Sequence, residues 1–140
     1  MSIEVAVYVL TALAGLVVVL TRVRLGGERA AGRLQIGTGL LGVHTGAGAL
    51  AMLVWVLFLV SPGDVVTGGE AVGIVALGLW WVVVLAGLMI LVRWLPSRGR
   101  HASGGATDSW SEGPGLSLLA HLGMLVGVLV FTWAYLTSVV

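Results

Sequence analysis

The apolar residues of this chain are gathered into four long runs, and short segments between the runs carry most of the charge. A helix needs about 20 mainly apolar residues to cross the hydrocarbon core of a bilayer. Four segments meet this length, so the pattern predicts helices over residues 3–21, 36–60, 71–94 and 115–138. Helices satisfy their own backbone hydrogen bonds, as lipid requires. We therefore expect an all-α integral membrane four-helix bundle, with residues 1–140 forming a single transmembrane domain.

The composition agrees with this class. Of the 140 residues, 59% are apolar and only 9% are charged, which is far from the balance of a soluble domain. The absence of cysteine excludes disulfides and thiolate metal sites. The net charge of +1 gives no sign of nucleic-acid binding, because the basic residues are sorted by segment and form no binding patch.

The basic residues indicate how the helices are oriented. All seven are arginines, and they lie only at the ends of the first and third predicted helices or in the connections after them, residues 22–35 and 95–114. The positive-inside rule places both connections in the cytoplasm. The first apolar run lacks the basic leading region of a cleaved signal peptide, so it is interpreted as a mature helix. We expect a multi-pass protein of the cell membrane, with both termini on the outer side.

The two halves of the chain repeat one pattern. The first and third helices each contain the tetrapeptide LAGL followed by an arginine, and the second and fourth each contain a histidine, a glycine two positions later and a tryptophan. The spacings agree within one residue, which predicts two tandem helical hairpins related by an approximate twofold axis along the membrane normal. The matched positions are Gly15, Arg22, His44 and Trp55 in the first half and Gly87, Arg93, His121 and Trp133 in the second.

The repeat places the two histidines at one level. Each lies within about eight residues of the cytoplasmic end of its helix, which at 1.5 Å per residue is on the order of 10 Å. With neighbouring axes about 8–10 Å apart, the second and fourth helices would be diagonal partners, with room for a flat ligand between His44 and His121. We expect Gly15 and Gly87 near the same depth, where missing side chains open a cleft or allow close packing.

With His44, Gly46 and Gly48 in one helix and His121 and Gly123 in another, the chain resembles the four-helix membrane b-type cytochromes. In that family, histidines on different helices bind a haem iron from both faces. The resemblance covers the four-helix layout and implies one haem b near the cytoplasmic face, with His44 and His121 as its metal ligands. Six-coordinate iron of this kind leaves no open position for oxygen, which suits electron transfer rather than catalysis.

Haem propionates are anionic and need cationic neighbours near a membrane surface. Arg22 and Arg93, at the ends of the first and third helices, are the candidates for that role. The positive-inside rule alone also explains both arginines. Copper is an alternative metal, because Met124 follows His121 by three residues and would add a soft ligand on the same helix face.

Two functions of different class remain open. An ionisable residue inside a membrane span is by default a functional hypothesis, which favours a small b-haem electron carrier that exchanges electrons with a quinone or another redox partner. Neutral histidines also form hydrogen bonds between helices, which favours a haem-free accessory or assembly subunit. Both functions imply a place among other subunits of a membrane complex. Trp55 and Trp133 are interpreted as interfacial belt residues near the outer ends of their helices.

Overall fold

The computed structural model describes residues 2–27, 38–94 and 114–140. Its elements are four α-helices and one short 3-10 helix, and no strand occurs in these ranges. The predicted all-α four-helix bundle is confirmed. The helices are α1 (Ile3–Gly27), α2 (Thr38–Val60), α3 (Glu70–Trp94) and α4 (Pro114–Leu136), and η2 (Val66–Gly68) lies between α2 and α3.

The observed bounds of α2, α3 and α4 lie within two residues of the prediction, whereas α1 continues six residues beyond its predicted end at residue 21. The prediction ended α1 where the apolar run meets Arg22. Arginine is a good helix former, and a helix does not need to stop where the apolar core ends. Helix α1 therefore includes Arg22 and Arg24 and ends at a pair of glycines, residues that are common at helix C-termini.

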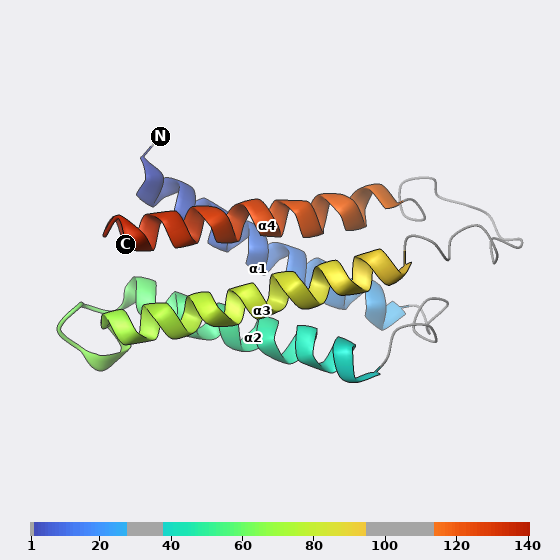
Figure 1. Cartoon of the computed structure of the whole chain (residues 1–140), viewed down its shortest axis with the longest axis horizontal. Helices are drawn as coiled ribbons and strands as arrows, with labels where there is room; N and C mark the ends of the chain where they lie inside the picture. Colours follow the sequence, from blue (N-terminus) through green and yellow to red (C-terminus); the bar gives the residue numbers. More distant parts are fainter. Residues whose placement is uncertain (1, 28–37, 95–113) are drawn as a thin grey trace, which may run out of the picture.

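Figure 1 shows α2, α3 and α4 side by side, with α3 in the middle, and α1 crossing them obliquely. Helix α3 packs most extensively on α2 and next on α4, while α1 packs mainly on α4. Both termini lie at the same end of the bundle as the turn between α2 and α3 (Figure 1). We call this the turn end, and we call the opposite end, where α1 and α3 finish, the arginine end.

The described helices are suited to a bilayer. Three of them contain segments long and apolar enough to cross a membrane, and α1 is 25 residues long with a shorter apolar part, Ile3–Val18. Large apolar side chains such as Leu13, Leu53, Leu85 and Leu129 are at least half exposed. An exposed apolar surface of this extent is favourable against lipid and unfavourable against water. The three segments are Gly42–Val60, Glu70–Val92 and Leu118–Leu136.

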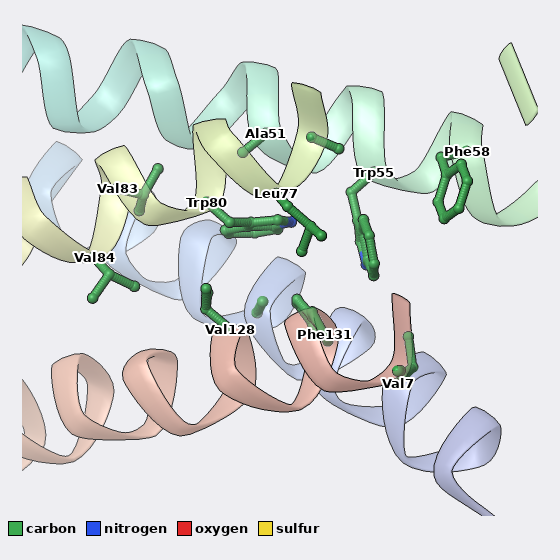
Figure 2. Close-up of a cluster of buried hydrophobic side chains, with 13 residues drawn as sticks. Val7, Ala51, Trp55, Phe58, Leu77, Trp80, Val83, Val84, Val128 and Phe131 are labelled. Atoms are coloured by element: carbon green, nitrogen blue, oxygen red, sulfur yellow. The ribbon is translucent and has the colours of Figure 1, made fainter. Parts of the chain in front are cut away.

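Aromatic side chains fill the interior of the half of the bundle nearer the turn end (Figure 2). Trp55 of α2 and Phe131 of α4 stack with ring centroids 4.9 Å apart, and Trp80 of α3 lies 5.9 Å from Phe131. The interpretation of Trp55 as a belt residue is wrong, because its side chain is fully buried. Its indole N–H donates to the Thr11 hydroxyl oxygen at 3.1 Å, and this bond satisfies the polar atom inside the bundle.

Candidate functional site

The imidazoles of His44 in α2 and His121 in α4 lie next to each other. Their ring centroids are 6.2 Å apart and their planes differ by 21°. Both side chains are half-buried. Helix α3, which lies between α2 and α4, brings Gly87 to the same level. The fold thus brings together the two histidines and one of the two glycines that the sequence pattern selected.

Gly87 is in close contact with both rings. A Cβ atom at this position would lie 2.9 Å from Cδ2 and 3.3 Å from Nε2 of His121, and 3.1 Å from Cε1 of His44. Carbon atoms normally pack at about 3.5–4.0 Å, so a side chain at position 87 would have to push the rings aside. Glycine is what allows the backbone of α3 to approach both imidazoles.

A hydrogen bond to α3 orients the ring of His44. Its Nδ1 lies 3.1 Å from the backbone carbonyl oxygen of Val83. A carbonyl oxygen only accepts, so Nδ1 carries the hydrogen, and the lone pair of the neutral ring is then on Nε2. Metal-binding histidines commonly use this arrangement, in which one ring nitrogen donates to a backbone carbonyl and the other binds the metal. Val83 and Gly87 are four residues apart, so one face of α3 makes both contacts.

The structure does not bring Gly15 to the imidazoles. A Cβ at Gly15 would lie 3.7 Å from the Cε atom of Met52, at ordinary contact distance. Gly15 and Gly87 are matched in the repeat, yet their surroundings differ because α1 crosses the bundle obliquely (Figure 1). The approximate twofold pattern of the sequence therefore does not extend to the packing of α1.

Arg22 lies in the last two turns of α1, and Arg93 is the second-last residue of α3, so both positions are toward the arginine end of the bundle. The side chains of Arg22 and of Arg93, near the end of α3, lie outside the described part of the structure.

The described residues offer few further metal ligands. They contain no group of three or more histidine, cysteine, aspartate or glutamate side chains that could hold a metal ion. Met124, the proposed soft ligand, packs against the hydrophobic cluster as a partly buried residue. A metal between the imidazoles would therefore need further ligands from a cofactor. The alternative is a metal ion that binds with a low coordination number.

Sequence reasoning missed a second ring pair of the same construction. Phe58 of α2 and Tyr135 of α4 have ring centroids 5.9 Å apart, and a Cβ at Gly73 of α3 would lie 3.0 Å and 2.5 Å from their ring atoms. Phe58 is 14 positions from His44, Tyr135 is 14 positions from His121, and Gly73 is 14 positions from Gly87. That constant spacing of four helical turns is the signal that could have revealed it.

Comparisons of the chain with protein-family models, with curated proteins and with solved structures found no match. The interpretation of the site therefore depends on its own residues and geometry.

Proposed function

We propose that the protein is a small membrane electron carrier whose redox centre is held between His44 and His121, with haem b as the cofactor. The meeting of two imidazoles from different helices inside the bundle carries this proposal. Two imidazoles that bind one metal through bonds of about 2 Å each, from opposite sides, have ring centroids roughly 6 Å apart. The centroid distance of 6.2 Å agrees with that arrangement.

The number of ligands favours haem. His44 and His121 would be the two protein residues that hold the haem, and a haem iron would need no further ligand from the chain. Haem would supply one-electron chemistry at the iron. The hydrogen bond from His44 to Val83 would hold the ring with Nε2 as the metal-binding atom. Arg22 and Arg93 are the proposed partners of the propionates.

Room for the macrocycle depends on α3. Gly87 already touches both rings, so a porphyrin between them requires α3 to stand farther from the pair than it does in this structure. The same closeness favours a second candidate, a copper ion bound by the two imidazoles, because a bare ion takes less room than a macrocycle. Imidazole suits copper, and a soft Met ligand would favour Cu(I).

The third candidate is a cofactor-free accessory subunit. It is favoured by the hydrogen bond between His44 and the Val83 carbonyl, which already gives His44 a partner in helix packing. In every case we propose a place in the cell membrane with the arginine end toward the cytoplasm. A carrier of this size also needs a donor and an acceptor, for which a quinone and other membrane subunits are the proposed partners.

Absorption spectra of the purified oxidised and reduced protein, together with its metal content, test the proposal. Reduced b-type bands together with iron support haem. Copper without haem supports the second candidate. Protein that contains neither haem nor copper, although it was produced in cells supplied with both, supports the accessory subunit. His44→Ala and His121→Ala should each abolish haem binding, and the double variant should lose little more, because both residues serve one iron. The control is His101→Ala, which removes the third histidine of the chain, in the connection after the third helix, and it should retain the spectrum. Full haem content in either single variant would contradict the proposal.

A further inference from the structure

The turn end contains a cavity of about 220 Å³, far along the bundle from the histidine pair. One water molecule occupies about 30 Å³ in the liquid, so the cavity has room for a small organic group. It lies where the start of α1, the end of α2, the turn after α2 and the residues Val139 and Val140 meet. The lining residues used below are Glu4, Tyr8, Phe58 and Ser61.

The polar side chains of the lining are a carboxylate and two hydroxyl groups, those of Glu4, Tyr8 and Ser61. The Tyr8 hydroxyl donates to the carbonyl oxygen of Leu59 at 3.4 Å, and the Thr67 hydroxyl donates to Ser61 Oγ at 2.8 Å. A hydroxyl oxygen has two lone pairs, and a carboxylate only accepts. The three side chains therefore suit a ligand that carries hydrogen-bond donors.

The charge at this end has a single sign. Glu4, Asp64 and Glu70 lie there, while all seven basic residues of the chain belong to positions 22–33 and 93–100. Fixed charge of one sign raises the local concentration of ions of the other sign. The rings of Tyr8 and Phe58 line the same cavity, and aromatic faces attract cations. Acceptors, negative charge and aromatic faces all favour a cation.

Helix capping alone does not account for this arrangement. Glu4 is in the first turn of α1, where a carboxylate interacts favourably with the helix dipole. Glu70 has the same position in α3 but does not line the cavity. The two glutamates therefore form a matched pair, in which one is a helix-start residue beside the cavity and the other a helix-start residue away from it.

We propose that this cavity binds a primary ammonium group, R–NH₃⁺. Such a group has three N–H donors and one positive charge, which suit the Glu4 carboxylate and the hydroxyl oxygens of Tyr8 and Ser61. A trimethylated ammonium has no N–H donor and could not form a hydrogen bond with the Glu4 carboxylate. At a membrane surface the group can come from a phosphatidylethanolamine headgroup or from a soluble amine.

The test uses the full chain in nanodiscs of phosphatidylcholine, with or without phosphatidylethanolamine. After extraction into detergent, the lipid that stays bound to the protein is measured by mass spectrometry. Binding of free ethanolamine to the protein in nanodiscs of phosphatidylcholine alone is measured by NMR saturation transfer. We expect selective retention of the ethanolamine lipid. Loss of a charged hydrogen bond should lower retention about tenfold in Glu4→Gln. Glu70→Gln should retain as much as the wild type.

The two measurements distinguish a lipid headgroup from a soluble amine as the source of the ammonium group. Binding of free ethanolamine without retention of the lipid assigns the site to a soluble amine. Equal retention of both lipids without ethanolamine binding, or equal results for wild type and Glu4→Gln, overturns the proposal. Ser61→Ala changes the cavity without touching the start of α1, so a loss of binding in this variant at unchanged helix content excludes misfolding as the cause.

Discussion

At the scale of single residues, position 87 connects the fold to the candidate site. The side chains of His44 and His121 come from helices on either side of α3, and they are in contact with α3 where it has no side chain. The contrast with Gly46, where a Cβ would meet nothing within 4 Å, shows that glycines of this chain are not equivalent. One position limits the space between two rings, whereas the other is open.

Gly87→Ala should therefore disturb the histidine pair. The added Cβ would meet both rings at about 3 Å, and relief of such overpacking typically costs about 1–3 kcal/mol of stability. We expect a lower temperature of thermal unfolding, and reduced binding of haem if the proposed function is correct. Gly46→Ala is the matched control, and it should behave like the wild type. Unchanged unfolding of Gly87→Ala would contradict the close contact.

The second prediction at this scale concerns the hydrogen bond between Thr11 and Trp55. This bond joins α1 to α2 inside the bundle, where water does not compete. Thr11→Val leaves the buried indole N–H without this partner and should lower the free energy of unfolding by about 1–3 kcal/mol. Trp55→Phe should cost more than the hydrogen bond alone, because it also removes volume from a fully buried ring. In a double-mutant cycle the two losses should not add, because both remove one bond. Additive losses, measured in detergent by denaturant unfolding, would show that the two residues act separately.

At the scale of helices, α3 organises the bundle. It runs antiparallel to α2 and α4 and meets a ring from each helix at Gly73 and again at Gly87, four turns later. The first pair consists of Phe58 and Tyr135 and is closed by packing and by a hydrogen bond from the Tyr135 hydroxyl to the Glu70 carbonyl oxygen, 2.8 Å long. The two levels share a backbone layout and differ in the chemistry of their rings.

The shared layout predicts that histidines placed at positions 58 and 135 would form a second pair like His44 and His121. If the histidine pair binds the proposed cofactor, the double variant with Phe58→His and Tyr135→His should bind a second equivalent of it, measured as haem or metal per chain. Stability should fall by about 1 kcal/mol, because the bond to the Glu70 carbonyl is lost. Phe58→His alone should add no second equivalent. A double variant that folds and binds only one equivalent would show that the two levels are not interchangeable.

The sequence predicted the existence and the bounds of the helices well, because apolar run length is a local property that the bilayer requires. It did not predict which face of each helix points inward. These helices are apolar nearly all round, so the pattern gives no stripe from which to read the buried side. Trp55 was therefore misplaced at the interface, and Gly15 was expected beside the histidines. The oblique path of α1 is a product of packing between helices that the repeat does not encode.

For the whole molecule, the sidedness of the bundle is a separate prediction. The described arginine positions, 22, 24 and 93, lie toward one end of the bundle and the described acidic residues at the other, and positive charge favours the cytoplasmic side. A reporter fused after Val140 or inserted near Gly68 should give an outer signal, and one inserted near Gly104 a cytoplasmic signal. A cytoplasmic signal at Val140 would contradict four crossings with both termini outside.

The contact of Gly87 with rings from two other helices also has a consequence for biogenesis. The ribosome completes His44 long before His121, and no part of α2 and α3 alone contains the second imidazole. The pair exists only after the last helix has been synthesised and has docked beside α3. A ligand that needs both imidazoles, such as the proposed haem, could therefore bind only at this late stage of membrane insertion.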